Sequence, residues 1–71
     1  MNPTPDEIRL LRIRLRLTQT EAATLVGAAL RTWQHWEAAT GTPDHRKMPA
    51  PAWELFTLKT ARRVKLLKFP L

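Results

Sequence analysis

The sequence contains no cysteine, which excludes a disulfide framework and a thiolate metal site. It also lacks a long hydrophobic run, because the longest stretch without a charged residue is 22–30, far short of the roughly 20 apolar residues of a membrane-spanning helix. The first residues, Met-Asn-Pro-Thr-Pro-Asp-Glu, show neither the basic region nor the apolar core of a signal peptide. We therefore expect a cytoplasmic protein, stabilised by packing alone or with a partner subunit.

Residue groups that carry catalysis are missing as well. There is no Ser-His-Asp grouping, no glycine-rich phosphate loop and no pair of inward carboxylates, and a chain this short has no room for a sizeable cleft. The two histidines, His35 and His45, lack Cys, Asp or Glu partners at metal-ligand spacing. We expect no enzymatic activity, no cofactor and no metal ion.

What the sequence does have is positive charge. Twelve Lys and Arg against six Asp and Glu give a net charge of +6, with a pI near 11.3. The surplus continues to the last residues, because five basic residues and no acidic one follow Glu54. Such a surplus attracts polyanions, which here means nucleic acid or an anionic membrane surface, although a soluble basic protein without such a partner has the same composition.

Helix-capping signals divide the 71 residues into short helices of one small domain. Thr4 and Glu7 mark one helix start, and Thr18 and Glu21 repeat the pattern. The sequence predicts helices at residues 5–16, 19–26, 30–39 and 51–62. Residues 64–71 are compatible with a longer helix, a strand or disorder.

Residues 18–37 show the pattern of a helix-turn-helix, two short helices joined by a turn. Ala23 is small enough for the second helix to cross the first, and Gly27 permits a positive φ in the turn. At 100° per residue, Trp33, Trp36 and Glu37 share the inner face of the second helix, where the tryptophans anchor it in the core. The outer face carries Arg31, Gln34, His35 and Ala38.

These residues resemble the Cro/λ-repressor-type (XRE) family of helix-turn-helix regulators. The matching stretch is Leu17-Thr18-Gln19-x-Glu21-x-Ala23-x-x-Val26-Gly27, followed by Trp33-x-x-Trp36-Glu37. The resemblance is close over about residues 8–37 and loose elsewhere. It implies an all-α, compact four- to five-helix λ-repressor-like DNA-binding domain over residues 1–71, with the helix-turn-helix at about 18–39 and a C-terminal helix with an apolar, basic tail at about 51–71.

By this resemblance, the second helix of the pair lies in the major groove of DNA. Arg31 is suited to guanine and Gln34 to adenine, each through two hydrogen bonds, and the apolar Leu30 suits a thymine methyl. The resemblance implies base contacts from Leu30, Arg31, Gln34 and His35. It implies phosphate contacts from Thr18 and Gln19, and the loop before the last helix adds Arg46 and Lys47.

The family also often pairs an arginine on the first helix with the glutamate that ends the third, which here are Arg12 and Glu37. The chain departs from the family pattern in several places, among them Trp33 and Trp36, where the family usually has aliphatic residues, and a long loop before the last helix. Ala29 replaces the usual Ser or Thr cap of the third helix, and Arg16 replaces a frequent glycine.

The expected function is a transcriptional regulator of double-stranded DNA, most simply a repressor that controls its own operon in a phage or mobile element. A single domain has little contact area, so we expect a homodimer on an inverted repeat. Its interface is expected among the apolar C-terminal residues Trp53, Phe56, Val64, Leu66, Leu67 and Phe69. The alternatives are an antitoxin-like protein that binds a partner protein and represses its own operon, and a tail that binds a membrane surface.

Overall fold

The structure is a computed structural model that describes the backbone of residues 2–66 and the side chains of residues 2–63. Over this range the chain forms four helices, α1 (Pro5–Arg14), α2 (Gln19–Leu25), α3 (Leu30–Glu37) and α4 (Ala50–Leu66), and no strand. The predicted all-α fold is therefore confirmed. None of these four helices in the described part of the chain is long and apolar enough to cross a membrane.

The N-terminal caps explain where the first helices begin. The Thr4 hydroxyl accepts from the Glu7 amide while the Glu7 carboxylate accepts from the Thr4 amide, and Thr18 and Glu21 form the same reciprocal pair. The bond from the Thr18 amide holds the pKa of Glu21 below its ordinary value. Ala29, at the start of α3, makes no side-chain cap, so this helix lacks a stabilisation worth about 1 kcal/mol.

The end of α1 comes two residues earlier than predicted, because Arg16 adopts a left-handed conformation with φ +58°. The Arg16 amide donates to the Ile13 carbonyl and the Leu17 amide donates to the Arg12 carbonyl, a pattern that closes a helix. Glycine is the residue best suited to this position, so the arginine costs about 1–2 kcal/mol of conformational strain.

The two later helices also differ in length from the prediction. α3 ends at Glu37 rather than residue 39, because Ala38 turns to extended backbone with ψ 142°. In the loop that follows, the Arg46 amide nitrogen donates a hydrogen bond to the His35 carbonyl oxygen, at 3.0 Å. α4 continues to Leu66 rather than residue 62, and no glycine or proline lies within residues 52–66 to end it.

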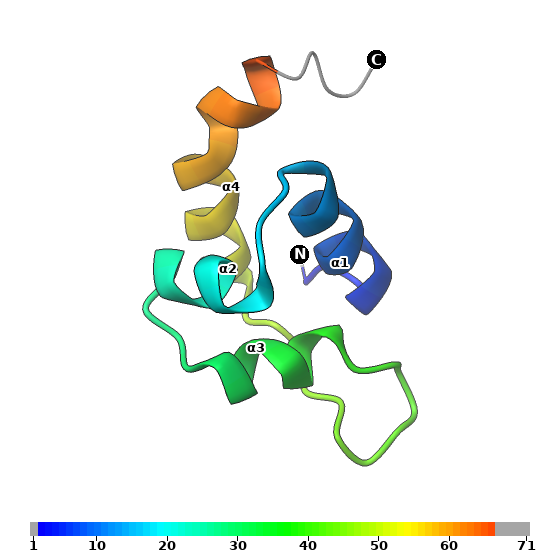
Figure 1. Ribbon diagram of the computed structural model, residues 1–71. Helices are drawn as coiled ribbons and strands as arrows, with labels where there is room; N and C mark the ends of the chain where they lie inside the picture. The colour runs from blue at the N-terminus through cyan, green and yellow to red at the C-terminus, as the bar shows by residue number, and fades with distance from the viewer. Residues whose placement is uncertain (1, 67–71) are drawn as a thin grey trace.

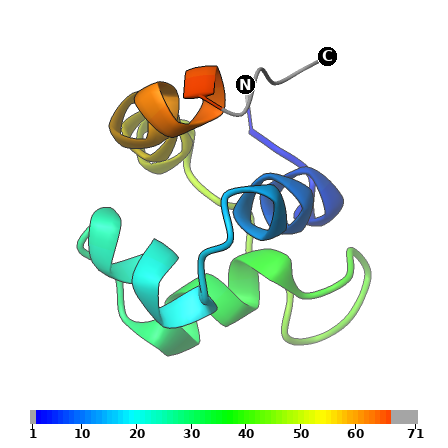
Figure 2. The ribbon, with the colours of Figure 1, turned by 45° about the horizontal axis from the view of Figure 1, so that its top comes forward.

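The four helices surround a common interior (Figures 1 and 2). α3 packs against both α1 and α2, and α2 also packs against α4. Ala22 and Ala23 of α2 are fully buried between their neighbours, which shows why small residues occur there. The loop after α3 extends from the same end of the molecule as α3 before the chain returns to α4 (Figure 1).

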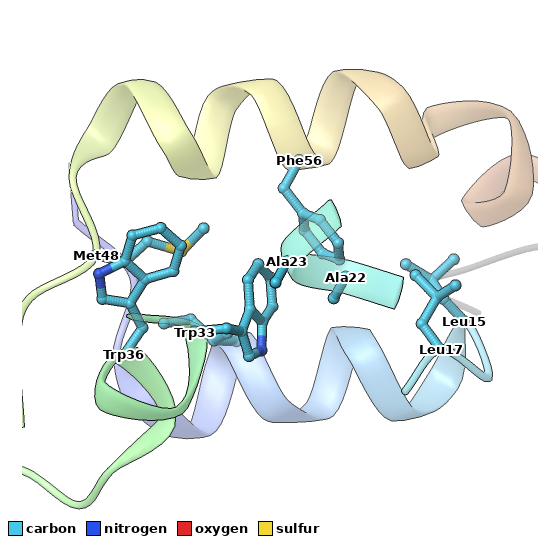
Figure 3. Packing of buried hydrophobic residues seen from close by; sticks show 9 residues of the cluster. Leu15, Leu17, Ala22, Ala23, Trp33, Trp36, Met48 and Phe56 are labelled. Atoms are coloured by element: carbon cyan, nitrogen blue, oxygen red, sulfur yellow. The ribbon is translucent and has the colours of Figure 1, made fainter. Parts of the chain in front are cut away.

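The core is built on an aromatic series that crosses from α3 to α4. The rings of Trp33 and Phe56 lie 5.1 Å apart between centroids, Trp33 and Trp36 5.6 Å, and Trp53 and Phe56 5.9 Å. These tilted and stacked contacts add to the large apolar area that each ring buries. Around them, the buried apolar residues are Ile8, Leu15, Leu17, Ala22, Ala23 and Met48 (Figure 3).

One expectation about the dimer interface is wrong. Phe56 was expected in the interface, but its side chain has no exposed surface because it packs against Trp33 in the core. Trp53 is partly buried against the same core. The backbone of Val64 and Leu66 belongs to α4, while their side chains, and Leu67 and Phe69 entirely, lie outside the described residues.

Candidate functional site

The outer face of α3 brings together the four residues expected to contact bases. Arg31 and Gln34 are exposed, Leu30 is 41% exposed, and His35 is half-buried. Together with Ala38 and Asp44 they line an open hollow of about 550 Å³ between α3 and the following loop. The helix therefore presents polar and basic groups outward, while Trp33 and Trp36 on its inner face are buried.

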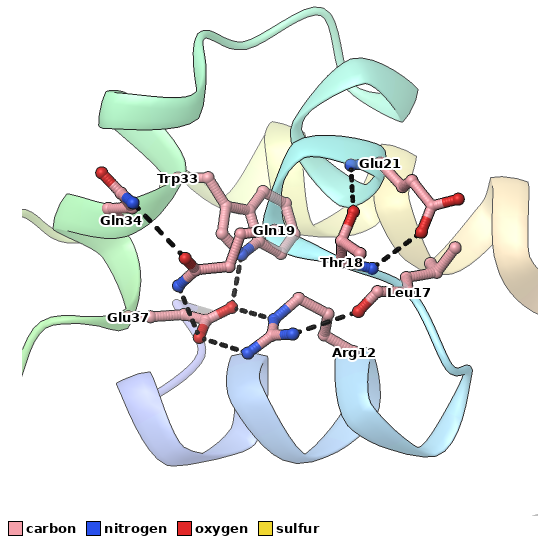
Figure 4. A network of polar contacts seen from close by, with 8 residues as sticks. All are labelled: Arg12, Leu17, Thr18, Gln19, Glu21, Trp33, Gln34 and Glu37. Atoms are coloured by element: carbon pink, nitrogen blue, oxygen red, sulfur yellow. Dashed lines mark hydrogen bonds and ion pairs between the residues drawn. The ribbon is translucent and has the colours of Figure 1, made fainter.

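An ion pair fixes α3 to the rest of the molecule (Figure 4). The guanidinium of Arg12 donates from Nε to Glu37 Oε2 at 2.5 Å and from a terminal nitrogen to Oε1 at 3.0 Å. It also donates to the Leu17 carbonyl at 3.0 Å, so one side chain joins α1, the turn before α2 and α3. The side chains of Arg12 and Glu37 are 14% and 5% exposed, so the expected Arg12–Glu37 contact is present and is largely shielded from solvent.

The Glu37 carboxylate also accepts from two further groups, the indole Nε1 of Trp33 and Gln19 Nε2, the latter at 3.2 Å. Burial disfavours its charged form, but the hydrogen bonds from Arg12, Trp33 and Gln19 outweigh burial, so the pKa of Glu37 lies below its ordinary value. The position of α3 is therefore set by a charged group that stays ionised at neutral pH and by the tryptophan that it binds.

The expected phosphate contacts at the start of α2 have defined orientations. Gln19 donates to Glu37, and its Oε1 accepts from Gln34 Nε2 at 3.5 Å. The two glutamines are thereby coupled across the α2–α3 pair (Figure 4). Thr18 is exposed at the N-cap, with its hydroxyl accepting from the Glu21 amide.

The loop that follows α3 is tied back onto the helix. His35 Nδ1 lies 2.7 Å from the Asp44 carbonyl oxygen, and His45 Nδ1 lies 3.0 Å from the Ala38 carbonyl oxygen. The Arg46 amide donates to the His35 carbonyl at 3.0 Å. The loop therefore forms a fixed wall of the hollow. Asp44 is a residue of the hollow that was not predicted from the sequence, because its contact uses a backbone carbonyl, which no side-chain spacing reveals.

The basic residues of this loop remain at the surface. Arg46 is exposed, with one terminal nitrogen donating to the carbonyls of Pro43 and His45 at 2.9 and 2.8 Å. Lys47 is exposed as well. Two exposed cationic side chains therefore lie in the segment between Asp44, which lines the hollow, and the start of α4.

Exposed apolar residues occur elsewhere on the molecule, on α1 and α4. Leu10 and Ile13 on α1 are 55% and 53% exposed, and Leu55 and Leu58 on α4 are 38% and 67% exposed. A spacing of three residues places each pair on one side of its helix. A helical-wheel reading of α1 would have found the first pair.

The comparisons with known proteins add no relative. No model of a known protein family matches this chain, and a search of curated proteins finds no match. The function proposed next therefore rests on the residues and geometry of the chain itself.

Proposed function

We propose that this protein is a sequence-specific DNA-binding transcriptional regulator, a repressor that acts by occupying its operator. In this proposal α2 and α3 form a helix-turn-helix and α3 enters the major groove. The observation that carries it is the division of α3 into two faces. Trp33 and Glu37 hold one face against the core, and the other presents Arg31, Gln34 and His35 outward.

Each group on the outer face has a chemical role in such a complex. Arg31 offers two parallel donors to guanine, and Gln34 offers a donor and an acceptor to adenine. Leu30 suits a thymine methyl group. The phosphate contacts belong to Thr18, Gln19, Arg46 and Lys47, which position the domain without reading sequence.

The net charge of +6 supports a polyanionic partner. One domain of this size makes few contacts, so we propose that two copies bind an inverted repeat with half-sites about 34 Å apart. Repression of its own operon is proposed from the family resemblance alone, and a location on the nucleoid follows from DNA binding.

Selection of duplexes from a random pool tests the proposal. We expect one enriched half-site, repeated in inverted orientation at about one helical turn. Purified protein that enriches no sequence, and that binds no duplex in dilute buffer, would refute the function.

Two variants separate base readout from phosphate binding. Arg31→Ala is expected to weaken binding to the selected site by about 1–3 kcal/mol, to relax the preference at one position and to leave the fold intact. Lys47→Ala is the matched control, because loss of a phosphate contact weakens all sequences alike and reduces the salt slope of log K by about 1. An Arg31→Ala variant with the wild-type preference would remove Arg31 from the readout.

A further inference from the structure

The geometry points to His35 as a reader of exocyclic amino groups, those of adenine N6 or cytosine N4, through a lone pair on Nε2. This inference rests on the proposed DNA binding and adds that, in one base contact, His35 accepts the hydrogen bond and the base donates it. It begins with the contact between His35 Nδ1 and the Asp44 carbonyl oxygen, at 2.7 Å.

That contact fixes the position of the ring proton. A backbone carbonyl oxygen only accepts hydrogen bonds, so Nδ1 is the donor and carries the hydrogen. In a neutral imidazole one nitrogen is protonated and the other holds a lone pair, and the partner of one nitrogen determines the state of the other. Nε2 of the neutral His35 ring is therefore an acceptor.

The carbonyl that sets this tautomer is held in place by the loop. The Arg46 amide donates to the His35 carbonyl and the His45 amide donates to the Thr42 carbonyl, at 3.0 and 3.2 Å. The His45 ring and the Arg46 guanidinium bind further carbonyls of the same segment. The Asp44 carbonyl therefore keeps its place beside α3 before any ligand arrives.

Nε2 is open to a ligand. Among the described residues no hydrogen bond to Nε2 of His35 occurs, and no buried side-chain nitrogen or oxygen lacks a partner. An unpaired Nε2 must therefore reach the surface, and His35 lines the open hollow together with Arg31 and Gln34.

An acceptor in the major groove discriminates between bases. Adenine N6 and cytosine N4 present amino donors there, whereas guanine O6 and N7 and thymine O4 present acceptors that repel a lone pair. Guanine is thus left to Arg31, and His35 selects an amino group at its own position. A single hydrogen bond of this kind is worth about 2- to 13-fold in discrimination.

The tautomer can be measured without DNA. Long-range ¹H–¹⁵N correlation spectra of the labelled protein in mildly alkaline buffer report which nitrogen of each histidine is protonated. With only two histidines in the chain, the signals that disappear in a His35→Gln variant are those of His35, and those that remain belong to His45. We expect a neutral His35 ring with hydrogen on Nδ1. A ring protonated at Nε2, alone or at both nitrogens, would overturn the inference whether or not the protein binds DNA.

The second measurement uses the selected duplex. At the position read by His35, replacing adenine by purine, or cytosine by 2-pyrimidinone, removes only the amino group and is expected to weaken wild-type binding about 2- to 13-fold. The two replacements also distinguish which base supplies the donor. His35→Ala is expected to bind both duplexes equally, and His35→Gln, whose amide both donates and accepts, to tolerate guanine there.

Lys47→Ala is the matched control, because Lys47 is an exposed residue of the same loop that does not line the hollow and makes none of the contacts that hold the Asp44 carbonyl. It is expected to keep the wild-type base preference. If the wild type is indifferent to loss of the amino group at every selected position, while Arg31→Ala still alters the preference, the His35 assignment fails and the proposed function stands.

Discussion

Removal of the charge on Glu37 tests how α3 is held. The carboxylate accepts from Arg12, Trp33 and Gln19, and its side chain is only 5% exposed. Glu37→Gln keeps the shape of the side chain but leaves the largely buried Arg12 guanidinium without a counter-charge. Breaking one side of a buried pair costs about 3–5 kcal/mol, and because the glutamine oxygen still accepts one hydrogen bond we expect about 3 kcal/mol.

That loss is large for this chain. A domain of 71 residues has a total stability of about 4–11 kcal/mol. A loss of about 3 kcal/mol lowers the Tm of such a domain by about 12–24 °C. Urea denaturation followed by tryptophan fluorescence measures the change, since Trp33 is fully buried and Trp36 is 7% exposed in the folded state.

The dependence on pH identifies the cause. The pKa of Glu37 is lower in the folded state than in the unfolded state, so its stabilisation is complete above the unfolded value of about 4.3 and is lost as the pH falls through the folded value. The stability gap between the wild type and Glu37→Gln should be constant from neutral pH to about pH 5, should begin to narrow near the unfolded value of about 4.3, and should close only as the pH falls through the lower folded value.

Two further variants complete the experiment. Asp6→Asn removes an exposed ion pair, in which the side chain of Asp6 is 76% exposed and that of its partner Arg9 is 46% exposed. This change should lower the free energy of unfolding by less than about 1 kcal/mol. Adding Arg12→Met to Glu37→Gln should recover part of the loss, because the unpaired charge is gone. A gap below about 1 kcal/mol at neutral pH, or one unchanged in acid, would refute the reasoning.

Three other predictions concern stability and use the same urea assay. Phe56→Ala should lower the free energy of unfolding by about 3–5 kcal/mol, because the ring is fully buried. Leu58→Ala, at a 67% exposed position, should change it by less than about 0.5 kcal/mol. Equal effects of the two substitutions would contradict the placement of Phe56 in the core. Ala29→Ser should gain about 1 kcal/mol by capping α3, and no gain would show that the cap geometry is wrong. Arg16→Gly should gain about 0.5–1 kcal/mol by relieving a positive φ, and a loss would mean that the arginine side chain stabilises the turn.

Local signals in the sequence located the helices well. The reciprocal Thr–Glu caps at Thr4 and Thr18 depend only on residues three apart, so they can be predicted from the sequence without a structure. The inner face of α3 could be predicted for the same reason, because Trp33, Trp36 and Glu37 are spaced so that they share one side of a helix, and all three are buried. The Arg12–Glu37 contact was anticipated only through a family resemblance, because nothing local joins residues 25 apart.

Contacts between distant segments needed the tertiary structure. The sequence alone determined an all-α chain with capped helices, a basic charge and an α3 with one apolar and one polar face. Only the packed molecule decided that Phe56 belongs to the core rather than to an interface, and that the Asp44 carbonyl meets His35. The reason is physical: helix periodicity is a property of neighbouring residues, whereas burial and backbone-carbonyl contacts depend on which surfaces the folded chain brings together.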